Sequence, residues 1–374
     1  MQTRKVNFKC FGENDDRDLV GNEIRNTITL SLTFALAFTS YISIQTLQSS
    51  LNQKAGLGVT SLACLYAFVI VSSACAPTVI KLIGGKLSLV AAWTVHTIYI
   101  ASNFYPTFAT LNPSIITGSL WTSQGLFLST NGASLARTKH QDLHAVLSNL
   151  NGLFCTIHET SHVTGNIISS LVLNRNSYDE FENTTKLCGA MDCPLSVNAT
   201  KIVEPDNQVV YILLGIYLVF DLIALLVTVL FISPLPRSKW NEKKSLKSSV
   251  SSCFSALGDY KVLMLLPLFG FMAMEQAVLW ADFTKSFISC PFGIQNVGFI
   301  IGTYGASTVI SNIVLSRLAR FTGSHFLYVL AFTLNMAIFA ALYLWTQDQE
   351  YYLYIIAALW GIPEGVWQAQ TNVF

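Results

Sequence analysis

Residues 208–232 read QVVYILLGIYLVFDLIALLVTVLFI, an apolar stretch in which Asp221 is the one charged residue. At 1.5 Å per residue in a helix, a stretch of this length crosses a hydrocarbon core of about 30 Å. The whole chain has the same character, because 52% of its 374 residues are hydrophobic and 11% are charged. A soluble domain carries about a quarter charged residues. The sequence therefore predicts a protein that crosses a membrane many times.

About ten stretches of this kind occur along the chain. We interpret each as a helix, because backbone polar groups in lipid must be satisfied within the segment, and a membrane barrel would show shorter, alternating stretches. The expected spans are residues 26–46, 58–80, 87–105, 109–131, 145–173, 208–232, 261–287, 293–316, 325–346 and 351–373. We predict an all-α membrane protein.

Basic residues are distributed unevenly between the loops. The N-terminal segment 1–25 and the loops after the second, fourth, sixth and eighth spans hold most of the 22 Lys and Arg residues. Lys and Arg collect in cytosolic loops. We therefore expect a cytosolic N-terminus, with the intervening loop 174–207 on the extracellular side.

The loop 174–207 carries two further signals of the oxidising side of a membrane. Asn183 and Asn198 each begin an Asn-x-Thr glycosylation sequon. Cys188 and Cys193 lie between the sequons, close enough in sequence to form a small disulfide. Glycosylation and disulfides both belong to that compartment, so these signals agree with the charge distribution.

Traces of an internal repeat suggest two related halves. Trp121-Thr-Ser-Gln124 in the fourth span recurs as Trp367-Gln-Ala-Gln370 in the tenth. These helices are equivalent if a second half starts at the seventh span. Many transporters consist of two six-helix repeats of this kind.

The domain boundaries follow from this plan. Residues 26–232 would form a six-helix N-terminal half, and the polar, Ser-rich stretch 233–260 a cytosolic linker. Residues 261–374 would form a C-terminal half with four helices. Two helices of a complete plan would then be missing, so we expect a partial sequence or a truncated isoform.

Several short motifs resemble one known family. The chain is similar to the unc-93 family, an ion channel regulatory branch of the major facilitator superfamily. The resemblance covers residues from about 25 to the end. It depends on Leu47-Gln-Ser-Ser-Leu51, Gly56-Leu-Gly-Val-Thr-Ser-Leu62, Gly165-Asn-Ile-Ile-Ser-Ser-Leu171, Cys188-Gly-Ala-Met-Asp-Cys193, Leu213-Leu-Gly-Ile-Tyr217 and Leu359-Trp-Gly361 followed by Val366-Trp-Gln-Ala-Gln370.

The resemblance carries expectations about fold and function. It implies a major facilitator-like bundle of twelve spans, glycosylation between the fifth and sixth spans, and regulation of a potassium channel. The loop residues 81–86 and 317–323 resemble the basic, Gly-containing loop motif of the superfamily, but neither contains its Asp. The gating role of that motif is therefore in doubt here.

The run His158-Glu159-Thr-Ser-His162 fits the pattern of a zinc protease, with two histidines one helical turn apart. A catalytic zinc needs a third protein ligand, which the sequence does not supply, so we expect neither an enzyme nor a metal site. Glu159 lies within a span, where a carboxyl group must be protonated, paired or in contact with water. It is either a hydrogen-bonded helix contact or, with His162, part of a polar cavity.

Other polar residues within the spans are candidates for a functional role. Glu364 matches an acidic position of the family pattern. Asp282 and Lys285 are three residues apart and would form an ion pair at a membrane interface. Gln124 and Gln370 are costly facing lipid and so should face protein or a cavity, whereas Trp121 and Trp367 are either interfacial anchors or cavity-lining rings.

The resemblance to the unc-93 family implies a regulator or accessory subunit of a potassium channel, and we expect it in the plasma membrane. The alternative is a secondary transporter of a small solute that works by alternating access of two halves. We expect the lipid bilayer and channel subunits as partners. The sequence contains no nucleotide-binding loop, nucleophile triad or basic patch that indicates a cofactor or nucleic acid.

Overall fold

The computed structural model describes residues 21–52, 56–107, 118–174, 188–191, 205–235, 255, 258–322, 324–345 and 349–371. Within this part the chain is helical and contains no strand, which confirms the all-α prediction. Both sequons lie outside the described residues, so glycosylation of Asn183 and Asn198 stays a prediction.

Ten long helical elements account for the expected spans in the described part of the chain. They are α1 (Glu23–Leu51), α2 (Leu57–Ile83), α3 (Gly85–Ser102), α4 (Gly118–Lys139), α5 (Leu143–Leu173), α6 (Asn207–Phe231), α8 (Tyr260–Ala277) continued by the π-helical η3 (Val278–Ser289) and α9 (Cys290–Phe292), α10 (Val297–Thr322), α11 (Ser324–Tyr343) and α12 (Tyr351–Thr371). The short turns η2 (Gly189–Met191) and η4 (Ile294–Asn296) complete the set. Six of the ten are long and apolar enough by composition alone to cross a membrane.

The fourth span differs from its predicted bounds. α4 ends at Lys139 instead of residue 131. The helix continues because its polar residues find partners inside the protein: the Asn131 amide donates to Thr27 Oγ1 at 3.2 Å, and the Ser134 hydroxyl donates to Glu23 Oε1 at 2.8 Å. Hydropathy alone ends a span at such residues, whereas neighbouring helices can satisfy them.

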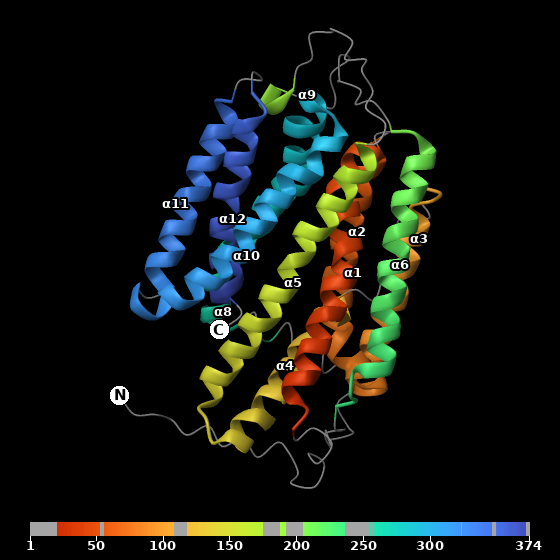
Figure 1. Cartoon of the computed structure of the whole chain (residues 1–374). Coiled ribbons are helices and arrows are strands. Elements are labelled where there is room, and N and C mark those ends of the chain that lie inside the picture. Colours follow the sequence, from red (N-terminus) through yellow and green to blue (C-terminus); the bar gives the residue numbers. More distant parts are fainter. Residues whose placement is uncertain are drawn as a thin grey trace.

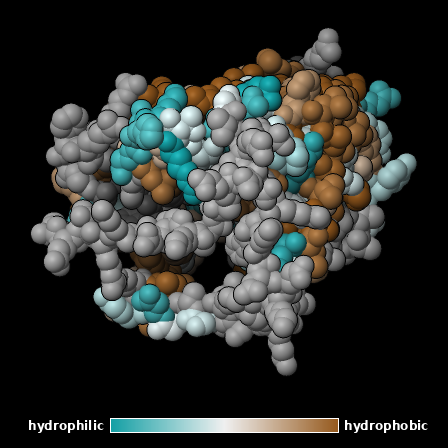
Figure 2. Space-filling model, turned by 90° about the horizontal axis from the view of Figure 1, so that it is seen from below, coloured by the Kyte–Doolittle hydropathy of each residue, from teal (hydrophilic) through white to brown (hydrophobic). Residues whose placement is uncertain are grey.

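The helices form one bundle in which α5 and α10 lie side by side near the centre (Figure 1). α1 packs against α5 and α6, and it also contacts η3. On the other side, α10 packs along α12, which contacts α11. Seen from the end where α1 begins, hydrophobic residues cover the right flank of the described surface, and hydrophilic residues are scattered over the rest of this face (Figure 2).

Glycines bring α5 and α10 into close contact. A Cβ atom at Gly298 of α10 would lie 1.9 Å from the carbonyl oxygen of Asn166 on α5, and one at Gly305 would lie 2.6 Å from His162 Cβ. One turn along α10 from Gly298, a Cβ at Gly302 would meet its nearest atom at an ordinary 3.5 Å. Small residues of this kind let membrane helices approach closely.

The predicted Cys188–Cys193 disulfide is wrong, because Cys188 is bonded to Cys290. Cys188 lies directly before the turn η2, whose Gly189 packs against Trp345 and Phe287. This contact places Cys188 beside the end of η3, far along the chain. Proximity in sequence favoured Cys193, but the fold brings Cys290 within bonding distance and a cysteine forms one such bond.

We expect Gly298→Ala to destabilise the bundle and Gly302→Ala to leave it unchanged or slightly more stable. The first methyl group would overlap the α5 backbone, which costs about 1–3 kcal/mol, whereas the second meets Ile167 at an ordinary contact distance and improves helix propensity. Thermal unfolding of the purified variants in detergent measures the difference. Equal melting temperatures for the two variants would contradict the close α5–α10 contact.

Candidate functional site

A cavity of about 240 Å³ lies within the bundle, between helices from both ends of the sequence. α1, α2, α3, α4 and α5 contribute to its wall, as do α8, η3 and α12. The lining residues are Phe38, Tyr41, Ile42, Gln45, Tyr66, Val69, His96, Trp121, His158, Glu159, His162, Gln276, Trp280, Glu364 and Gln368. The wall therefore combines aromatic faces, histidines and two carboxylates.

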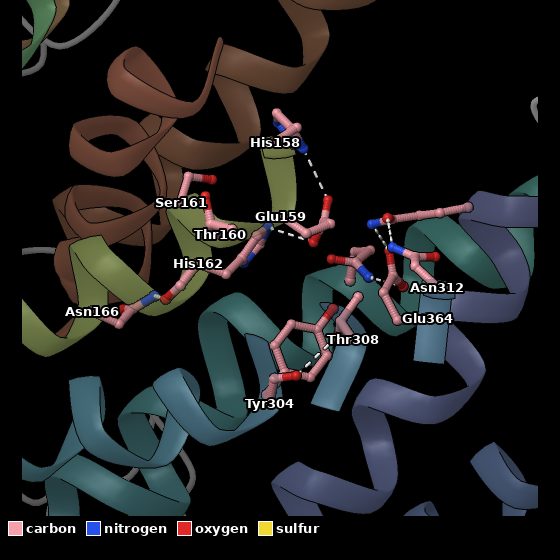
Figure 3. Close-up of polar contacts among 12 residues, drawn as sticks. His158, Glu159, Thr160, Ser161, His162, Asn166, Tyr304, Thr308, Asn312 and Glu364 are labelled. Carbon is pink, nitrogen blue, oxygen red and sulfur yellow. Dashed lines mark hydrogen bonds and ion pairs between the residues drawn. The ribbon is translucent and has the colours of Figure 1, made fainter. Parts of the chain in front are cut away.

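The His-Glu-x-x-His run of α5 forms one wall of the cavity (Figure 3). Glu159 is 1% exposed and lies between the two histidines: its Oε1 is 2.9 Å from His158 Nδ1, and its Oε2 is 3.5 Å from His162 Nε2. Among the described residues no group of three His, Cys, Asp or Glu side chains is arranged to hold a metal ion. Here Glu159 pairs with the histidines of its own helix.

Glu364 faces the same cavity from α12, opposite α5 (Figure 3). The Gln276 amide of α8 donates to Glu364 Oε2 at 2.7 Å, and the Gln368 amide donates to Oε1 at 2.9 Å. Asn312 of α10 in turn donates to Gln368 Oε1 at 3.1 Å. The carboxyl group is thus held by an amide network from three helices and stays on the cavity wall.

A third polar group lies on the α3 side of the cavity. His96 lines the cavity, and its Nδ1 is 2.9 Å from Asp221 Oδ2 on α6. The Ser40 hydroxyl of α1 donates to Asp221 Oδ1 at 2.5 Å. Asp221 therefore lies behind the cavity wall, where it is paired with His96 and Ser40. The contact with Asp221 fixes the orientation of the His96 ring.

Glu275 is a buried carboxyl group that does not line the cavity. Trp360 Nε1 donates to its Oε1 at 2.7 Å, and Trp367 Nε1 donates to its Oε2 at 3.1 Å. Trp367 is 1% exposed, so it is neither an interfacial anchor nor a cavity ring. Its role is to connect α12 to α8 through Glu275.

The remaining predicted residues lie in different surroundings. Trp121 lines the cavity and is 43% exposed, unlike its repeat partner Trp367. Gln124 is half-buried on α4 and is not a lining residue. Asp282 is exposed and Lys285 is half-buried on the π-helical η3, and an ion pair between them stays a prediction. The Gln370 side chain lies outside the described residues.

The sequence named Glu159, His162, Glu364 and Trp121 as candidates, and the structure places all four on one cavity wall. Much of the wall was missed. His96 is a histidine inside an apolar span, and such a residue is costly in lipid, so it carried a signal. Gln368 lies one helical turn after Glu364, a spacing at which side chains on a helix interact. The aromatic lining carried no such signal, because Tyr and Phe are common in membrane helices that face lipid.

The fold is that of known membrane transporters. Two crystal structures of the nucleoside transporter NupG, the first of them a point mutant, superpose with TM-scores of 0.61 and 0.55, at 13% and 14% sequence identity. The first match covers 93% of this chain and 86% of that one. The chain is therefore a multi-pass membrane protein with a major facilitator-like helical bundle.

Sequence comparison identifies the family. Residues 48–291 match the family model of the ion channel regulatory protein UNC-93. The chain is 34% identical to protein unc-93 homolog A of Xenopus laevis over 94% of this chain and 80% of that protein, and 32% identical to the Homo sapiens homolog over 93% and 80%. It is 28% identical to the putative potassium channel regulatory protein unc-93 of Caenorhabditis elegans, over 93% of this chain and 52% of that one. The protein belongs to the UNC-93 family, as its motifs indicated.

Proposed function

We propose that this protein regulates a potassium channel in the membrane that it spans. The observation that carries the proposal is membership of the UNC-93 family together with the similarity to the Caenorhabditis elegans protein, which extends over 93% of this chain. The names of its relatives describe regulatory proteins rather than enzymes. The proposed role is therefore that of an accessory protein that acts through contact with a channel.

Regulation by contact needs a surface that meets the channel within the bilayer. α6 exposes an apolar face that includes Val219, Leu226 and Phe231, and α8 exposes one that includes Met264 and Met274. Apolar surface of this kind is satisfied equally by lipid and by the apolar flank of another membrane protein. These faces support lateral association with channel subunits.

Co-expression should change the current of a two-pore-domain potassium channel at unchanged surface level of the channel. The measurement is whole-cell current with and without this protein, with Gly302→Ala as a control variant that retains the fold. A regulator acts on open probability or conductance, so we expect a shift in current per surface channel. Unchanged current for every channel of this class would contradict the proposal.

A second candidate function is transport of a small solute, and the cavity favours it. Charged and polar residues converge on it from α5 and α12, which belong to the two proposed six-helix halves. Near Cys290 the two sides meet through hydroxyl groups: Ser50 and Ser289 are 2.9 Å apart, and Ser170 donates to the Gln295 carbonyl at 2.5 Å. Contacts between the two sides at one end, with a cavity elsewhere between them, are typical of one state in alternating access.

We also propose that the Cys188 end of the bundle faces the extracellular side and that the N-terminus is cytosolic, with the plasma membrane as the location. The distribution of basic residues supports this orientation. So does the Cys188–Cys290 bond, because disulfides persist in oxidising compartments.

Peptide N-glycosidase should increase the mobility of the expressed protein on a gel, and Asn183→Gln with Asn198→Gln should abolish the change.

The same orientation predicts that, after denaturation without reductant, Cys290→Ser releases a reactive thiol at Cys188. Cys193→Ser should leave Cys188 blocked. Unchanged mobility after glycosidase treatment, together with a Cys188 thiol that reacts in the unaltered protein, would contradict the outward placement.

A further inference from the structure

The carboxyl groups of the cavity face one another across the boundary between the two sides of the bundle. Glu159 projects from α5 and Glu364 from α12, and the two interact electrostatically (Figure 3). The Gln368 amide lies between them, since it contacts Glu364 and also faces Glu159. Two like charges in a site of low polarity repel. None of the described lining residues is Lys or Arg, so the cavity wall holds no basic side chain other than histidine.

Two histidines of the wall each keep one ring nitrogen without a hydrogen-bond partner. An ionised carboxylate only accepts, so His96 Nδ1 donates to Asp221 and His158 Nδ1 donates to Glu159. In each neutral ring the Nε2 atom then carries a lone pair. Both Nε2 atoms are buried and lack a hydrogen-bond partner in the described part of the protein, and His96 and His158 are 5% and 7% exposed. Buried polar atoms without partners are rare and call for an explanation.

Aromatic rings form the rest of the wall. Phe38, Tyr41, Tyr66, Trp121 and Trp280 all line the cavity. The Phe38 ring lies 4.7 Å from the His158 ring, and Trp280 stacks on His162 at 5.5 Å. Aromatic faces attract cations, ammonium groups included, through their ring quadrupoles. A hard metal cation would instead need six or more oxygen ligands, which this mostly aromatic wall does not offer.

We infer that the cavity binds a small organic ammonium ion, with Glu159 and Glu364 as its counter-charges and the aromatic rings of the wall around it. An ammonium group supplies three donors and no acceptor, which matches a wall of carboxylates and aromatic faces. Its charge also offsets the repulsion between the two glutamates. The inference rests on the solute-carrying function proposed above and names the chemical class of the solute.

The test is a titration of the full chain, purified into nanodiscs of zwitterionic lipid, with phenethylamine. Phenethyl alcohol is the neutral counterpart of nearly the same shape, and potassium chloride supplies an inorganic cation. We expect saturable binding of the amine, at least about tenfold weaker binding of the alcohol because a charge-assisted contact is lost, and no competition by potassium. Equal binding of amine and alcohol, or displacement of the amine by potassium, would overturn the inference.

Variants separate a specific site from partition of the amine into lipid. Glu364→Gln keeps the size of the side chain but removes the charge, so it should weaken amine binding by about tenfold or more. The matched control is Glu275→Gln, because Glu275 is also buried but lies outside the cavity wall. The affinity of the Glu275→Gln variant for the amine should equal that of the unaltered protein.

The outcomes also separate this inference from the proposed functions. Amine binding that Glu364→Gln does not weaken overturns the inference whatever happens to channel currents. Specific binding without uptake of labelled amine into cells supports the site and removes the transport function. A change in channel current without amine binding leaves channel regulation standing and overturns the ammonium site.

Discussion

The constraint on which the rest of the structure depends is that a carboxyl group inside a membrane must find a partner. Unpaired carboxylates in the bilayer cost several kcal/mol, and several of those in the described spans are buried. Asp221 is paired with His96 and Ser40, and Glu275 with two tryptophans. Each of these sets joins different helices, so the polar groups hold the bundle together. The hydrophobic effect contributes little to this association, because lipid is as apolar as the buried side chains, so close packing and polar contacts carry it.

Glu159 and Glu364 satisfy the same constraint in a different way. Both carboxyl groups have polar partners, and both belong to residues that line a cavity. This position on a cavity wall supports the proposed role of Glu159 and Glu364 in binding a ligand. Asp221 and Glu275 are enclosed by donors from neighbouring helices, whereas Glu159 and Glu364 face one another across a space that a ligand can enter.

Most of the fold could be predicted from the sequence, because length and hydropathy are properties of single segments. The helices α5, α6 and α12 match their expected spans closely. α4 did not match its span, because residues of α1 supply hydrogen-bond partners for Asn131 and Ser134. No local pattern in the sequence reveals these partners. The pairing of Cys188 with Cys290 was missed for the same reason, since residues so far apart in sequence meet only through the packing of the turn η2 on Trp345 and Phe287. The candidate site was predicted in part. Acidic residues within apolar spans are easily recognised in a sequence. The different roles of Trp121 and Trp367 could not be predicted, because they depend on the residues that each ring contacts.

The central claim is that cross-helix polar pairs hold this bundle together, and the His96–Asp221 pair tests it most directly. A double-mutant cycle with His96→Leu, Asp221→Leu and the double variant gives their coupling free energy from unfolding in detergent. Pairs within membrane proteins contribute about 0.6 kcal/mol on average and charged contacts more. We predict a favourable coupling of about 1 kcal/mol or more, so that the double variant is less destabilised than the sum of the single ones. Additive effects of the two substitutions would contradict the account.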